Sequence, residues 1–136
     1  INFVPATDNV SLLCRVSQSG SFLSGGSDYF WGYQSAGGAT VDEADSQIVV
    51  SGGNVGNQTS EGVTLKLWLF RPGASSFQKT VVWTGFGRTG TPTSFGANGG
   101  GALAANTDAI DAIRFFFASS SNIASGYYAV RGYKFT

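Results

Sequence analysis

The feature that most constrains the fold of this chain is the strict alternation of apolar residues over Val63 to Phe70. A valine and three leucines occupy every second position of this segment, beginning with Val63. Successive side chains of a β-strand point to opposite faces of its sheet, so the pattern predicts a strand that seats one face on a core. Arg71-Pro72-Gly73 ends the strand, because proline cannot donate to a ladder and glycine permits a turn.

Similar strand signals recur along the chain, separated by glycine, serine, asparagine and proline. We expect strands over Val10–Ser17, Ser27–Tyr33, Gln47–Val50, Val63–Phe70, Lys79–Phe86, Ile110–Ala118 and Tyr127–Phe135. No long helix is predicted, since helical spacing is absent and β-branched and aromatic residues dominate the apolar positions. About seven or eight strands at this spacing predict an all-β fold, namely an antiparallel, jelly-roll-like β-sandwich.

The segments between the expected strands are predicted to be turns and loops. Gly87 to Ala105 is expected to form one long loop, which is uncommon in a compact domain and often functional. Ser119–Gly126 is expected to be a turn. Thr107–Ile113 could instead begin with a single helical turn capped by Thr107. These segments are the ones whose structure the sequence defines least.

The composition indicates one folded domain that associates with other chains. A chain of 136 residues corresponds to one domain, here residues 1–136. An aromatic content of 14% excludes disorder. Only 12% of residues are charged, against about 25% in ordinary domains, and so weakly charged a surface favours association. We therefore expect identical or different subunits to cover part of this surface. Because the chain begins at Ile1 rather than Met, we expect it to be the C-terminal domain of a longer protein.

The charge balance argues against two kinds of partner. The formal net charge is zero, and the eight basic residues are scattered along the chain. Binding that is led by phosphate contacts needs clustered lysine and arginine, so no nucleic-acid partner is expected. No apolar run approaches the roughly 20 residues of a membrane span, so no membrane insertion is expected.

The absence of histidine weighs against catalysis. It removes the commonest general base, the Ser-His and Cys-His pairs and histidine-ligated metals. Cys14, the single cysteine, is expected to be a buried, inert thiol, because Leu12 and Val16 flank it in an apolar alternation. The carboxylates show no arrangement that suggests the facing pair of a glycosidase. We expect no enzymatic activity and no cofactor, and a hydrolase that uses Glu61 or Asp42 is the distant alternative.

Three short motifs have weak functional interpretations. Gly85 to Gly90 fits the pattern G-x-G-x-x-G, but Thr91-Pro92-Thr93 follows where a dinucleotide site needs a helix. Asn57-Gln58-Thr59 is a formal glycosylation sequon that we interpret as a polar turn. The one acidic cluster is a weak candidate site for a hard cation such as calcium, and we favour a solvated loop. This cluster comprises Asp42, Glu43 and Asp45.

Aromatic residues provide most of the candidate binding side chains. Aromatic rings on strands can form a platform on which sugars stack, although alternating aromatics more often form a core or a subunit interface. The rings in question belong to Tyr29, Trp31, Tyr33, Trp68 and Trp83. The candidate binding residues are Tyr29, Trp31, Tyr33, Trp68 and Arg88.

The closing segment carries a resemblance to a known family. Residues 107–134 read TDAIDAIRFFFASSSNIASGYYAVRGYK. This segment resembles the terminal hairpin of bacteriophage virion proteins, in which an apolar strand, a Ser/Asn turn and Ile-Ala-Ser-Gly precede a closing strand. The resemblance implies a structural protein of the phage particle with its natural C-terminus at Thr136. It also places Arg114 and Arg131 on paired strands, and it identifies no active site.

The preferred hypothesis is a homotrimeric virion domain, associated with the phage tail, that attaches the particle to its host. Its partners would be other virion proteins and a glycan or protein of the host surface. The alternatives are a capsid head-decoration protein and a carbohydrate-binding module. Loops over Gly20–Ser27, Thr40–Asp45 and Gly87–Asn106 are expected to meet the partner.

Overall fold

The computed structural model describes residues 1–35, 37–91, 93–104 and 107–133. These residues form eleven β-strands and no helix. The predicted antiparallel β-sandwich is confirmed. The strands are β1 (Asn2–Pro5), β2 (Leu12–Gln18), β3 (Ser21–Phe22), β4 (Tyr29–Ser35), β5 (Gly38–Asp45), β6 (Ile48–Val49), β7 (Gly62–Phe70), β8 (Thr80–Arg88), β9 (Ser94–Leu103), β10 (Ala112–Phe117) and β11 (Ile123–Tyr127). No helix of the described chain is long and apolar enough to cross a membrane.

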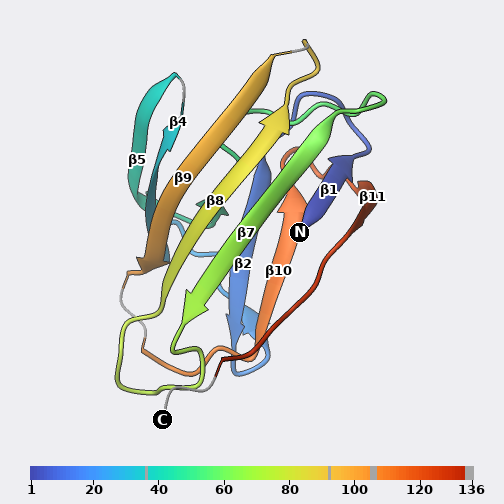
Figure 1. Cartoon of the computed structure of the whole chain (residues 1–136). Helices are drawn as coiled ribbons and strands as arrows, with labels where there is room; N and C mark the ends of the chain where they lie inside the picture. The colour runs from blue at the N-terminus through green and yellow to red at the C-terminus, as the bar shows by residue number, and fades with distance from the viewer. Residues whose placement is uncertain (36, 92, 105–106, 134–136) are drawn as a thin grey trace.

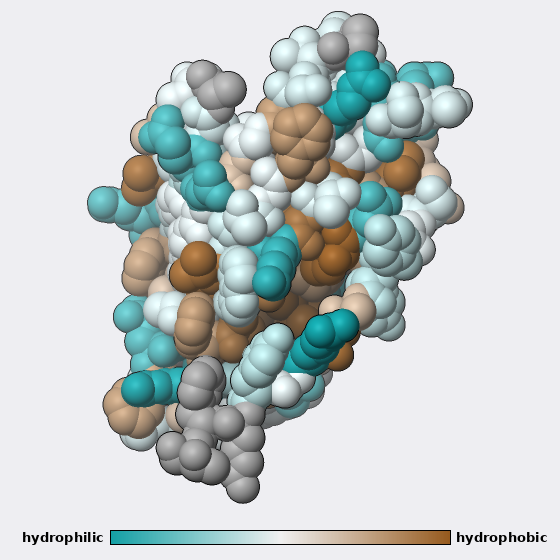
Figure 2. Space-filling view, in the orientation of Figure 1, coloured by the Kyte–Doolittle hydropathy of each residue, from teal (hydrophilic) through white to brown (hydrophobic). Residues whose placement is uncertain are grey.

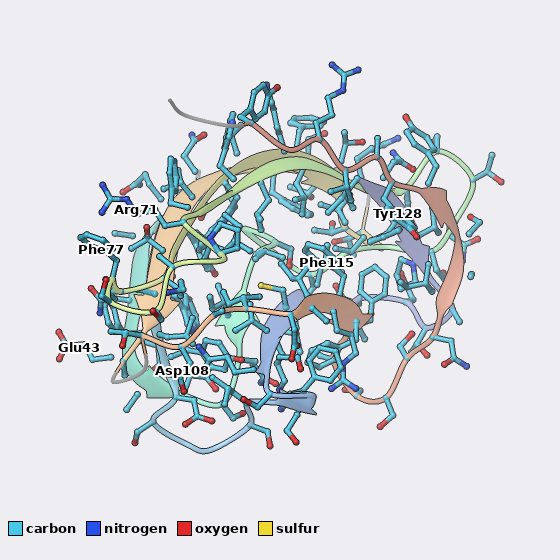
Figure 3. All side chains as sticks on the ribbon, turned by 90° about the horizontal axis from the view of Figure 1, so that it is seen from below. Glu43, Arg71, Phe77, Asp108, Phe115 and Tyr128 are labelled. Carbon is cyan, nitrogen blue, oxygen red and sulfur yellow. The ribbon has the colours of Figure 1, made fainter. Side chains whose placement is uncertain are left out.

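Two antiparallel sheets make up the sandwich. The larger sheet has seven strands in the order β11-β1-β7-β8-β9-β4-β5. The smaller sheet has the order β10-β2-β3, and β6 also pairs with β2. The long strands β7, β8 and β9 lie in front of β2 and β10 in Figure 1. Seen from below, in Figure 3, the larger sheet curves around the smaller one.

The alternation that predicts β7 directs its apolar residues into the space between the sheets. Val63 and Leu65 are buried there, and so are Val81 and Trp83 of the neighbouring strand β8. From the other layer, Leu12, Cys14 and Val16 of β2 are almost completely shielded from water. Burial of apolar surface of this extent is the main stabilising term of the fold. The predicted inward faces of β2 and β7 are therefore correct.

The predicted long loop over Gly87–Ala105 is wrong for most of its length. Residues Ser94–Leu103 form β9, a central strand of the larger sheet between β8 and β4. Glycine is depleted in strands, which is why the sequence pattern suggested a loop. Glycine is needed at position 99 because Gly99 lies against the indole ring of Trp83, where a Cβ would overlap that ring. Ala105 lies outside the described residues.

The predicted terminal hairpin is also wrong. The strand β10 pairs with β2 in the smaller sheet, whereas β11 pairs with β1 at the edge of the larger sheet. The chain thus changes sheets between the two strands, and Arg114 does not lie on a strand paired with Arg131. Residues 128–133 form no strand. Gly126 has a φ of 148° and lies so close to Asn2 and Phe3 that a side chain would collide with them.

One buried cation ties two loops to the sandwich. Lys79 is fully buried, and its Nζ donates hydrogen bonds to the carbonyl oxygens of Ala74, Phe77 and Thr107 at 2.5, 2.8 and 2.7 Å. The first two oxygens belong to the loop between β7 and β8, and the third to the segment before β10. The backbone N–H of Ile110 also donates to the oxygen of Pro72 at 2.8 Å. Three acceptors offset the cost of burying the ammonium group.

Candidate functional site

The outward face of the larger sheet carries a row of cross-strand neighbours with glycine at its centre. Trp68 of β7 pairs with Val82 of β8, which pairs with Gly100 of β9. Gly100 then pairs with Gly32 of β4, and Gly32 with Val41 of β5. Side chains directly opposite one another on adjacent antiparallel strands share a face, so the two glycines leave a dip between the two valines.

This dip is part of a shallow depression of about 610 Å³, which we call the outer groove. It crosses four strands, from β8 through β9 and β4 to β5. Its walls are mainly apolar, and Val82 and Val41 remain 43% and 70% exposed. The lining residues are Phe30, Trp31, Gly32, Val41, Asp42, Glu43, Gln78, Thr80, Val81, Val82, Gly100, Gly101 and Ala102.

The outer groove combines apolar walls with acidic groups at one rim. Phe30 is 37% exposed at one end, and the carboxylates of Asp42 and Glu43 lie at the β5 rim. Beyond the groove, Lys66 places its Nζ 4.9 Å from the centre of the Trp68 ring, a cation–π contact. Figure 2 views this side of the molecule and shows apolar patches separated by polar residues.

Two of the predicted binding aromatics lie in the interior and a third, Tyr33, is half-buried against the core, so the three do not form an exposed sugar-stacking platform. Tyr29 and Trp31 are 0% and 7% exposed. The hydroxyl of Tyr29 accepts a hydrogen bond from the N–H of Val16 at 3.0 Å, and the Trp31 indole donates to Asp45 at 3.1 Å. Tyr33 stacks on Trp31 with a centroid distance of 5.8 Å. Their alternation does share one face, as predicted, but that face is the inner one.

The other two predicted binding residues lie apart from each other. Trp68 is half-buried on the outward face, next to the outer groove. Arg88 ends β8, six residues along that strand from Val82, the partner of Trp68, and its guanidinium donates to the Ser60 hydroxyl at 3.2 Å. Six residues of a strand span about 20 Å, so the structure does not bring the two side chains together.

The acidic cluster lies on a strand and not on a loop. Asp42, Glu43 and Asp45 belong to β5, and Asp45 is engaged with the Trp31 indole and with the N–H of Ser46. Among the described residues no group of three potential ligands converges on a metal position. A second expected surface loop, Gly20–Ser27, is exposed except at Leu23. It includes the short strand β3.

The remaining motifs have structural explanations. Gly85 and Gly87 lie within β8, and no helix follows them, so the geometry of a dinucleotide site is absent from this part of the described chain. Asp42 on β5 and Glu61, beside the start of β7, are separated by four strand spacings, about 19 Å. That separation is too wide for a catalytic carboxylate pair. Asn57 donates its side-chain amide to the oxygen of Ala6 at 3.1 Å, in a polar turn.

Sequence reasoning named Trp31, Asp42 and Glu43 among the residues that line the outer groove, but it missed the others. Phe30 and Gly32 alternate with Tyr29, Trp31 and Tyr33. This alternation was the available signal that Phe30 and Gly32 lie on the opposite face of β4. Gly100 could not be assigned, because the sequence around it predicted a loop. Comparisons with protein families, with curated proteins and with solved structures found no match to this chain.

Cys14 gives a direct test of the core. Burial raises the pKa of its thiol from 9.0 to about 12. Reactivity requires the thiolate, so we expect no modification by Ellman's reagent at pH 8 in the folded protein and complete modification in urea. Rapid labelling of the folded protein would contradict the buried position of β2.

The same burial predicts alkaline unfolding. Burial raises the pKa of Tyr29 from 10.0 to about 12, alongside that of Cys14. Both pKa values are higher in the folded than in the unfolded chain, so this stabilisation is complete below pH 9 and is lost as the pH rises towards 12. The urea midpoint of unfolding should fall over that range. In a Cys14→Ala variant, the part of this decrease that begins near pH 9 should be absent, and the part due to Tyr29 should remain.

Proposed function

We propose that this chain is a non-catalytic binding domain of a bacteriophage particle, associated with the tail, that attaches the virion to its host through the outer groove. The observation that carries the proposal is the exposed, mainly apolar surface of this groove, on the outward face of a seven-stranded sheet. Exposed apolar patches rimmed by polar groups are typical of interaction sites. The sequence of residues 107–134, which resembles that of phage virion proteins, directs the proposal to a phage particle.

The shape of the groove favours a broad ligand over an enclosed small molecule. Its floor consists of backbone at Gly32 and Gly100, with Val41 and Val82 on either side. A backbone that is hydrogen-bonded into a central part of the sheet is ordered before binding, so little conformational entropy is lost on contact. A flat saccharide ring or an extended peptide of a host surface protein would fit such a floor.

Filling the floor with one methyl group should weaken binding without unfolding the domain. A Cβ at Gly100 would lie 3.5 Å from the Val81 oxygen, which is an ordinary contact, so Gly100→Ala should fold normally. At the surface it inserts a methyl where the ligand packs, a change that costs about 1–3 kcal/mol in a well-packed contact. We expect labelled protein to bind whole bacterial cells at least about fivefold more weakly.

The matched control is Gly96→Ala on the same strand. Its Cβ would lie 3.7 Å from the Gly85 oxygen, and Gly96 does not line the groove. Cell binding that is unchanged in both variants would remove the outer groove from the proposal. Binding to purified capsids but to no cell in a broad panel would favour head decoration. Quenching of Trp68 fluorescence by soluble polysaccharides alone would favour a carbohydrate-binding module.

A further inference from the structure

The end of the described chain exposes apolar side chains that this copy of the protein does not cover. The strand β11 pairs only with β1 and forms one edge of the larger sheet. Tyr127, Tyr128, Val130 and Tyr133 are 70%, 71%, 84% and 72% exposed. Within the described chain, residues 128–133 form no hydrogen bond. Unpaired backbone groups at a sheet edge, next to exposed apolar side chains, are a template for pairing with another strand.

The opposite edge of the same sheet has complementary properties. Among the described residues, β5 pairs only with β4, and its eight residues are close in length to the seven residues 127–133. It carries Asp42, Glu43 and Asp45 and no basic residue. Residues 123–136 contain Arg131 and Lys134 and no acidic residue. Two copies of β5 would repel each other, whereas β5 and the C-terminal segment attract.

We propose that residues 127–133 of one copy add as a strand to β5 of a second copy, so that the larger sheets join edge to edge. This inference rests on the proposed function, in which the domain assembles within a particle, and it identifies the surfaces that assemble. The two surfaces differ, so the contact is head-to-tail, and such contacts close into a ring when the rotation permits. Three copies would give the expected homotrimer.

The two edges of the larger sheet lie far apart within one copy. The edges β5 and β11 are separated by six strand spacings, about 29 Å. Figure 3 shows Glu43 and Tyr128 at opposite sides of the molecule, both pointing outward. Any covalent link between the two edges must therefore join different copies.

A charge swap tests the electrostatic part of the contact. We expect sedimentation equilibrium to give a mass of several chains for the unmodified protein, and Glu43→Lys or Arg131→Glu to raise the dissociation constant at least about tenfold. The double variant should recover most of the affinity. Glu43 is exposed and forms no hydrogen bond to a described residue, so its replacement leaves the fold intact.

The control variant carries lysine at two exposed loop positions, Ser24 and Thr59. It changes the net charge by the same amount and in the same direction as Glu43→Lys. It should assemble like the unmodified protein. Equal weakening by the control, or no recovery in the double variant, would overturn the charge complementarity. A monomer at protein concentrations of about 100 μM would overturn the interface itself.

Cysteine cross-linking tests the geometry. The native Cys14 is buried and will not interfere. A variant with Val41→Cys and a second cysteine, placed in turn at each of residues 128–131, should form covalent multimers on oxidation at one or more of these positions. Neither single substitution should do so. Covalent dimers from the C-terminal cysteine alone would indicate pairing of like edges and overturn the head-to-tail contact.

The two proposals fail separately. Multimers that cross-link as expected but bind no cells would retain the interface and remove host attachment. A monomer that binds cells in a groove-dependent way would remove the interface and retain attachment. Gly100→Ala should leave the mass unchanged, because Gly100 lies at the centre of the sheet, two strands from the β5 edge.

Discussion

Replacing Lys79 by methionine should lower the free energy of unfolding by about 3 kcal/mol. The substitution keeps most of the side-chain volume but removes three hydrogen bonds from a charged donor, each of which typically contributes about 1.5–3 kcal/mol. Methionine also removes the cost of burying an ammonium group, which offsets part of this loss. The oxygens of Ala74, Phe77 and Thr107 lose their shared donor and must find water or remain unpaired. The loop between β7 and β8 also loses its link through Thr107 to the segment before β10, although the hydrogen bond from Ile110 to Pro72 remains.

Urea unfolding followed by tryptophan fluorescence measures this effect, and Lys66→Met is the control. Lys66 is exposed on β7 and contacts only the face of Trp68, an interaction of about 0.5–1 kcal/mol at such a site. Proteolysis should first cleave the loop around Phe77 in Lys79→Met. If the two variants lose the same stability, Lys79 does not hold the loops.

The fold class followed from the sequence because its strongest signals were local. The alternation over Val63–Phe70 and the apolar run around Cys14 each define which face is buried, and both predictions are correct. Valine and leucine at alternate positions of a strand indicate directly which face of that strand is buried. The same reasoning placed Tyr29 and Trp31 on one face, but periodicity does not distinguish an inner aromatic face from an outer one.

The remaining features depend on contacts between residues distant in the sequence. Position 99 of β9 requires glycine because Trp83 of the neighbouring strand fills the space that a side chain would occupy. The buried Lys79 has no signal in the sequence, since its acceptors are carbonyl oxygens that any residue could supply. The outer groove likewise arises where Gly32 and Gly100 meet in register, which requires knowledge of the strand order.

The second large effect is expected at Gly99, where alanine should destabilise the fold by about 2–3 kcal/mol. A Cβ there would overlap the indole of Trp83 and lie 2.7 Å from the Gly32 oxygen. Trp83 is 1% exposed and cannot move towards solvent. The strand must therefore shift, or the ring must leave its rotamer.

A double-mutant cycle with Trp83→Phe separates steric overlap from a general preference against substitution in β9. The indole Nε1 of Trp83 is buried without a hydrogen-bond partner among the described residues, so phenylalanine removes the overlapping atoms and breaks no hydrogen bond. Trp83→Phe alone leaves a cavity, which the methyl group of Gly99→Ala partly fills. The double variant should therefore be more stable than the sum of the single effects by at least about 1 kcal/mol.

Gly100→Ala is the neighbouring control, with an ordinary 3.5 Å contact and an expected loss below about 1 kcal/mol. Additive effects in the cycle would mean that the indole does not set the requirement for glycine, and that the central position of β9 has another cause.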